Sequence, residues 1–137
     1  MLKFFALRNF QSFHEQVHIS LELNKHTPDD NRAFETPLGS KLSKALAVIG
    51  PNASGKTTLI KSLAFVSWFV YQSLHAKLDA PIPLIGHFGA SNETSEFEVE
   101  FEIDEKRLEI SIGSQRNTRL LRTPVLQTNE SLLLRIC

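Results

Sequence analysis

Apolar and polar residues alternate in four stretches of the chain, and such alternation predicts β-strands with one buried face. Residues 2–7 and residues 17–23 show this pattern on either side of a polar corner, so we expect them to form an antiparallel pair. Residues 97–103 and residues 107–112 alternate in the same way on either side of Glu105-Lys106. That arrangement predicts a second antiparallel hairpin.

Two segments between these hairpins show other patterns. Residues 45–49 form an uninterrupted apolar run that ends at Gly50, as in a strand buried on both faces. From Gly55 to about Leu74, apolar residues recur at helical spacing and predict a helix. Its buried stripe is expected to contain Leu59, Leu63, Val66 and Val70. Because the helix is apolar nearly all round over residues 63–71, we expect it to lie inside a larger body.

The two remaining long segments, residues 24–43 and residues 79–95, are rich in Pro, Gly, Ser and Asn, and we predict that they are loops. The first is long for a connection within a compact domain, which usually indicates a functional loop.

Length and composition are those of one ordinary globular domain: 137 residues, 42% hydrophobic and 22% charged. Fifteen basic residues balance fifteen acidic residues, so no overall charge draws the chain to nucleic acid or anionic lipid. A single cysteine, Cys137, excludes an internal disulfide. The most apolar segment, residues 59–71, is shorter than the roughly 20 residues that span a bilayer. We therefore expect a soluble, cytoplasmic protein without a membrane partner.

One motif carries chemistry, because residues 50–57 fit the pattern G-x-x-x-x-G-K-[ST] of a phosphate-binding loop (P-loop) between a strand and a helix. The predicted binding residues are Gly50, Pro51, Asn52, Ala53, Ser54, Gly55, Lys56, Thr57 and Thr58. In such a loop the backbone N–H groups and the helix N-terminus hold phosphate oxygens. Lys56 would place its charge on the β- and γ-phosphates as the catalytic residue, and the Thr57 hydroxyl would coordinate Mg²⁺. Thr58 could reach the α-phosphate. The alternative is a glycine-rich helix start with a surface lysine.

Several segments together resemble a known family. These are FFALRNFQSF at residues 4–13, ALAVIG at 45–50, the run GPNASGKTTLIKSLAFVSWFVYQS at 50–73 and the F-E-x-x-F-type hairpin at 97–101. The chain resembles the N-terminal part of an ABC-type ATPase head, of the branch with RecF-like, SMC-like and OLD-like ATPases. It is similar to bacterial AAA family ATPases linked to abortive infection and phage defence. The resemblance implies ATP and Mg²⁺ as cofactors, a head-to-head homodimer, and a DNA, toxin or nuclease partner.

The expected fold is therefore α/β: the N-terminal lobe of a P-loop NTPase, with antiparallel β-hairpins flanking a central strand and the P-loop helix. Two departures from the family matter. Gln11 stands where relatives often carry Arg, and we find no signature motif or Walker B strand ending in paired carboxylates. We thus expect residues 1–137 to be a partial ATP-binding domain, truncated at its C-terminal end, that binds ATP but hydrolyses it only with the missing lobe and a second head. A non-hydrolysing interaction module and a self-contained P-loop kinase or GTPase stay as alternatives.

Other residues of possible chemical interest have simpler explanations. His14 and His18 have zinc-ligand spacing only on a helix, and they flank a corner and a strand, so we predict structural roles. The acidic row Glu96, Glu98, Glu100 and Glu102 is predicted to be a solvated strand face, with Lys106 and Arg107 relieving its repulsion. Arg116, Arg119 and Arg122 are predicted to be a solvated face rather than a DNA-binding patch, and Phe65, Trp68, Phe69 and Tyr71 to be packing residues.

Overall fold

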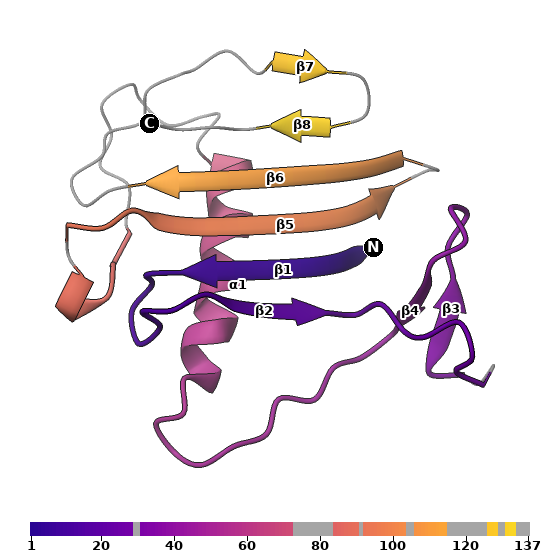
Figure 1. Ribbon diagram of the computed structural model, residues 1–137, viewed down its shortest axis with the longest axis horizontal. Coiled ribbons are helices and arrows are strands. Elements are labelled where there is room, and N and C mark those ends of the chain that lie inside the picture. The colour runs from indigo at the N-terminus through magenta and orange to yellow at the C-terminus, as the bar shows by residue number, and fades with distance from the viewer. Residues whose placement is uncertain are drawn as a thin grey trace.

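The computed structural model describes residues 1–28, 31–72, 84–90, 92–103, 106–114, 126–128 and 131–133. These residues form a mixed α/β structure in which one helix crosses an antiparallel sheet (Figure 1). The elements are β1 (Leu2–Arg8), β2 (Val17–Ser20), β3 (Ala33–Glu35), β4 (Lys41–Ser43), α1 (Lys56–Gln72), the 3-10 turn η1 (Phe88–Ala90), β5 (Ser95–Ile103), β6 (Lys106–Ser114), β7 (Leu126–Thr128) and β8 (Ser131–Leu133).

The main sheet has four strands in the order β2-β1-β5-β6. Strand β1 pairs antiparallel with β2, and β5 pairs antiparallel with β6 from Ser95↔Ser114 to Ile103↔Lys106. Both hairpins predicted from residue alternation are therefore confirmed. The pairing that joins them, β1 with β5, places Phe5 beside Val99 in the centre of the sheet.

Helix α1 packs against one face of this sheet, and the core lies between them (Figure 1). Aromatic rings fill this layer: the ring centroids of Phe10 and Phe65 lie 5.3 Å and 5.0 Å from that of Phe97. Such aromatic pairs contribute about 0.5–1.5 kcal/mol beyond the area they bury. The buried face of α1 contains Leu59, Ser62, Phe65, Val66 and Phe69.

The C-terminal part of α1 is more exposed than the sequence predicts, so the prediction that the helix is buried all round is wrong there. Val70 and Tyr71 are 36% and 72% exposed, whereas the sequence pattern predicts Val70 on the buried stripe and Tyr71 among the packing residues. The physical reason is that the sheet covers a single face of the helix. Within the described residues no second layer covers the other face. Phe65, Trp68 and Phe69 do pack with one another, as predicted.

The acidic row lies on the sheet face opposite α1. One of its residues is buried, whereas the sequence predicts that the whole row is solvated. Glu96 is exposed, but Glu102 is only 5% exposed. A register shift between Leu2 and Phe4 brings Lys3 toward this row, where its Nζ lies 3.5 Å from Glu100. The Nε of Arg107 lies 2.9 Å from the same carboxylate, so the predicted relief of charge repulsion by Arg107 is confirmed.

The predicted loop at residues 24–43 contains a second small sheet, formed by β3 and β4. Leu42, on β4, is 0% exposed. The backbone N–H of Leu23 donates to Lys41 O, and that of Ser43 donates to Leu21 O, which ties β4 to the end of β2. The hairpin lies beyond the end of the main sheet at which β1 begins (Figure 1).

Residues 45–49 differ most from their prediction, because they form no strand and are exposed. Leu46, Val48 and Ile49 are 51%, 46% and 90% exposed. A strand needs a neighbour for its backbone N–H and C=O groups. Within the described residues no segment pairs with this run, so the predicted central strand is not present here and the segment leads to α1 as an extended connection.

Candidate functional site

The loop of residues 50–55 curls tightly before α1 begins at Lys56. Two of its residues have left-handed backbones, Ala53 with φ 64° and Gly55 with φ 90°. Successive N–H groups in such a loop converge on a common point and form a concavity for anions. The first turn of α1 contains no acidic residue, so the positive end of the helix dipole is not opposed there.

The ammonium group of Lys56 lies back across the loop. Its Nζ donates hydrogen bonds to the carbonyl oxygens of Gly50 (2.8 Å) and Pro51 (2.5 Å), and lies 3.3 Å from Ser54 Oγ. Among the described residues no ion pair involves Lys56. The Lys56 ammonium group is therefore held against the loop, and its partners among the described residues are neutral oxygens.

Gly55 is needed for its backbone angle and for space. A φ of 90° is strained for any residue with a side chain. A Cβ at this position would also lie 2.7 Å from Cζ of Phe13, a contact that real structures do not contain. The Phe13 ring thus packs directly on the loop backbone. At Gly50 a Cβ would meet the side chain of Ser54, with Oγ at 2.9 Å, and a serine hydroxyl can move aside.

The two threonines after Lys56 have different surroundings. Thr57 is exposed, so its hydroxyl is accessible to a ligand. Thr58 is buried, and its Oγ1 accepts a hydrogen bond of 2.8 Å from the Ser12 hydroxyl. The other predicted binding residues, Pro51, Asn52, Ala53 and Ser54, are exposed on the loop. The nine residues from Gly50 to Thr58 therefore lie in one short segment at the start of α1, and Thr58 is the buried one among them.

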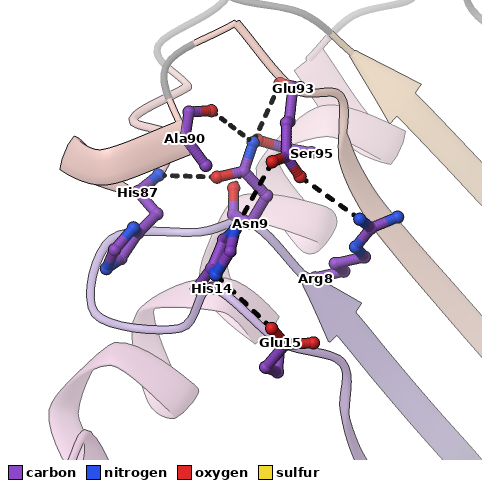
Figure 2. Close-up of polar contacts among 8 residues, drawn as sticks. All are labelled: Arg8, Asn9, His14, Glu15, His87, Ala90, Glu93 and Ser95. Carbon is purple, nitrogen blue, oxygen red and sulfur yellow. Dashed lines mark hydrogen bonds and ion pairs between the residues drawn. The ribbon is translucent and has the colours of Figure 1, made fainter.

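The corner between β1 and β2 is braced by the buried side chain of Asn9 (Figure 2). Asn9 Nδ2 donates to the carbonyl oxygens of Ala90 and Glu93, and its Oδ1 accepts from the backbone N–H of His87. The Ser95 hydroxyl donates to the Asn9 backbone oxygen. Asn9 also has φ 51°, a conformation that asparagine tolerates well. One residue thus joins the corner to residues 87–95.

Charged and imidazole side chains cluster on the outside of this corner (Figure 2). Glu93 lies between Arg8 Nη2 (3.2 Å) and His14 Nε2 (3.5 Å), while His14 Nδ1 lies 3.4 Å from Glu15. The ring of His14 stacks on that of His87, with centroids 5.2 Å apart. The corner therefore presents both charge and ring faces at its surface.

The two histidines with zinc-ligand spacing are separated, as predicted: His18 lies on β2 and stacks against Phe4. In the part of the chain that the structure describes, no group of three His, Cys, Asp or Glu side chains is arranged to hold a metal ion. Over the described ranges, no helix combines the length and the apolar character that crossing a membrane requires. Arg116, Arg119 and Arg122 lie outside the described residues.

Sequence reasoning did not predict the contacts of Asn9, Ser12 and Phe13 with the loop and with residues 87–95. These residues belong to the segment FFALRNFQSF at residues 4–13, which is part of the family resemblance. It carried no information on their partners, which lie 46 or more residues away along the chain in the case of Ser12 and Asn9.

Comparison with known families adds an independent finding. Residues 45–135, which are 91 of the 137 residues, match the family described as "AAA domain, putative AbiEii toxin, Type IV TA system". The chain belongs to this family. Searches of curated proteins and of solved structures gave no match. The function that membership of this AAA family indicates is nucleotide binding of the ATPase type, and the mixed α/β fold of this AAA domain is consistent with a P-loop NTPase.

Proposed function

We propose that this AAA domain binds ATP with Mg²⁺ through the loop of residues 50–57, as the nucleotide-binding part of an ABC-type ATPase head. The observation that carries the proposal is the position of Lys56. Its ammonium group lies over a loop with left-handed residues at a helix N-terminus, and its hydrogen-bond partners among the described residues are neutral oxygens of that loop. A triphosphate offers such a cation stronger, charged acceptors.

The residues of the loop fit Mg·ATP in their donor chemistry. Backbone N–H groups of the curled loop would hold phosphate oxygens, and Lys56 would neutralise the β- and γ-phosphates. The exposed Thr57 hydroxyl would be a ligand of Mg²⁺, which prefers oxygen donors. Thr58 Oγ1 accepts from Ser12, so its own proton is left for the α-phosphate. Bound Mg²⁺ would supply positive charge that polarises phosphate oxygens.

Hydrolysis requires more than these groups, because a carboxylate must orient the attacking water. Within the described residues no ion pair or hydrogen bond joins a carboxylate to Lys56 or Thr58. We therefore propose that turnover needs a Walker B carboxylate and a second head that closes on the nucleotide in a head-to-head homodimer. The chain by itself is expected to bind ATP and to hydrolyse it very slowly or not at all.

The test is calorimetric titration of the 137-residue chain with ATP, with and without Mg²⁺. Wild type should bind ATP, and Lys56→Ala should weaken binding at least about tenfold, since hydrogen bonds to charged groups contribute roughly 1.5–3 kcal/mol. Lys61→Ala is a matched control, because Lys61 is an exposed lysine on the same helix. Equal ATP affinity of Lys56→Ala and wild type would refute the proposal.

A further inference from the structure

The corner between β1 and β2 contacts α1 at two places along one face of the helix. Phe10, which is 2% exposed, has its ring centroid 6.0 Å from that of Phe65. The hydroxyl of Ser12 donates a hydrogen bond of 2.8 Å to Oγ1 of Thr58. Thr58 and Phe65 are seven residues apart, which is about two helical turns, so they lie on the same face. The corner therefore follows α1 down to its first turn, where the proposed phosphate site lies.

A tight turn fixes the backbone that carries Ser12. The N–H of Phe10 donates to the carbonyl oxygen of Phe13 (2.8 Å), and the N–H of Phe13 donates to the carbonyl oxygen of Phe10 (2.9 Å). Gln11 and Ser12 form the turn between them, and the N–H of Gln11 donates to Ile85 O (2.9 Å). The ring of Phe13 then packs on Gly55 of the loop. Backbone hydrogen bonds and a side-chain contact thus hold the turn on both sides of Ser12.

Backbone strain is concentrated in this corner and in the loop. Within the described residues, the non-glycine residues with positive φ are Asn9 (51°), Gln11 (50°) and Ala53 (64°). The first two belong to the corner and the third to the loop. Such conformations persist only where the surrounding structure holds them, and they cluster at ligand-binding and active sites. The strain therefore indicates a function for the corner as well as for the loop that it contacts.

The hydrogen bond from Ser12 restricts the hydroxyl of Thr58. On a helix, a threonine side chain divides between two rotamers, because its hydroxyl can also bond a backbone carbonyl three or four residues earlier. For Thr58 these carbonyls belong to Gly55 and Ser54, which are part of the loop. Donation from Ser12 favours the rotamer that directs Oγ1 toward the corner, and it uses a lone pair of Oγ1 and not its proton. The proton of Thr58 is therefore left for another acceptor.

We propose that Ser12 is a positioning residue of the phosphate site: it holds the Thr58 hydroxyl in the orientation that donates to a phosphate oxygen of the bound nucleotide. This inference rests on the proposed function and deepens it by adding a residue that lies outside the loop. Because Ser12 acts on a contact to phosphate, its effect should be the same for any ligand with the same phosphate chain.

Other side chains of the corner do not offer this role. The ring of Phe13 contacts the loop at Gly55, but it has no hydrogen-bonding group. The side chain of Asn9 is engaged with His87, Ala90 and Glu93. Among the described residues of the corner, Ser12 therefore provides the side-chain hydrogen bond to the segment of residues 50–58.

The experiment is calorimetric titration with ATP and with inorganic tripolyphosphate, each in the presence of Mg²⁺. We expect Ser12→Ala to weaken both ligands to the same extent, about threefold to tenfold, which corresponds to the net contribution of one hydrogen bond. Ser12→Thr keeps the hydroxyl at an exposed position and should restore wild-type affinity. Ser67→Ala removes an exposed hydroxyl from the same helix and should change neither affinity.

A double-mutant cycle separates positioning from a general loosening of the loop. If Ser12 acts through the hydroxyl of Thr58, Ser12→Ala should cause no further loss of ATP affinity in a Thr58→Val background. Circular dichroism at the titration temperature shows whether each variant is folded. An equal loss in both backgrounds would indicate a structural role and overturn the proposal.

The remaining outcomes are equally decisive. Wild-type affinity of Ser12→Ala, a weakened Ser12→Thr, or a loss for ATP without one for tripolyphosphate would each refute the positioning role. If Lys56→Ala still weakens ATP binding in these cases, the phosphate site stands and the role of Ser12 alone is refuted. A wild type that binds neither ligand refutes both proposals.

Discussion

The hydroxyl of Ser12 donates a hydrogen bond of 2.8 Å to Oγ1 of Thr58, which lies 46 residues further along the chain. The bond connects the β1–β2 corner to the first turn of α1, beside the contact between Phe13 and Gly55. The proposed phosphate loop is therefore held by the edge of the sheet as well as by its own helix.

The Ser12–Thr58 bond should be measurable by a double-mutant cycle. We expect Ser12→Ala and Thr58→Val each to lower the free energy of unfolding by about 1 kcal/mol, since each removes one partner of a partly buried hydrogen bond. The double variant should lose clearly less than the sum of the two. Urea unfolding provides the measurement, and Ser67→Ala, at an exposed position of the same helix, is the control. Strict additivity would mean that the bond contributes nothing.

The two left-handed glycines offer a comparison of strain with and without a steric clash. Gly39→Ala introduces a Cβ at φ 79° with no atom within 4 Å, and should cost about 1–2 kcal/mol of stability. Gly55→Ala introduces one at φ 90° against the Phe13 ring, so a further penalty of about 1–3 kcal/mol is expected from overpacking. Thermal unfolding of both variants tests this order. Equal losses would show that Phe13 moves aside freely.

Glu102 should make stability depend on pH. Burial acts to raise the pKa of this carboxyl, but the hydroxyls of Thr36 and Ser40 and the charges of Lys3 and Arg107 outweigh it and hold the pKa below 4.5. Neither hydroxyl reaches the geometry of a close hydrogen bond. Because the folded pKa is lower than the unfolded one, the stabilisation is complete above about pH 4.5 and is lost as the pH falls through the folded pKa.

The measurement is the free energy of unfolding of wild type and Glu102→Gln between acidic and neutral pH. The variant should lose stability at neutral pH and show a weaker decline in acid than wild type. Glu96→Gln, on the same strand but exposed, should keep the wild-type pH profile. Parallel profiles for wild type and Glu102→Gln would contradict the role given to this carboxyl.

Because the apolar run at residues 45–49 is exposed, we expect substitutions in it to have little effect on stability. Ile49→Ala should change the free energy of unfolding by less than about 0.5 kcal/mol, as for an ordinary surface position. Phe69→Ala, which removes a ring that is 1% exposed, should cost about 3–5 kcal/mol. Chemical denaturation of the two variants decides the matter. A loss of several kcal/mol for Ile49→Ala would mean that this run is buried in solution.

The sequence by itself determined the features that depend on neighbouring residues. Alternation over residues 97–103 and 107–112 specified the β5–β6 hairpin, because side chains of a strand point to opposite faces in turn. The spacing of apolar residues specified α1 to within a few residues of its observed ends. The motif at residues 50–57 specified a glycine-rich loop before that helix, since its backbone angles are a local property of Gly55 and its neighbours.

Only the tertiary structure decided which of these local patterns are buried and which distant groups meet. The apolar run at residues 45–49 has the sequence pattern of a core strand, yet it is exposed. Burial depends on a second segment that packs against the run, and the sequence of the run does not specify one. The sequence pattern predicts that Glu102 is solvated like Glu96, yet Lys3 and the turn between β3 and β4 surround it. The contacts of Asn9, Ser12 and Phe13 likewise join segments far apart in the chain, and their geometry follows from how the sheet and helix pack together.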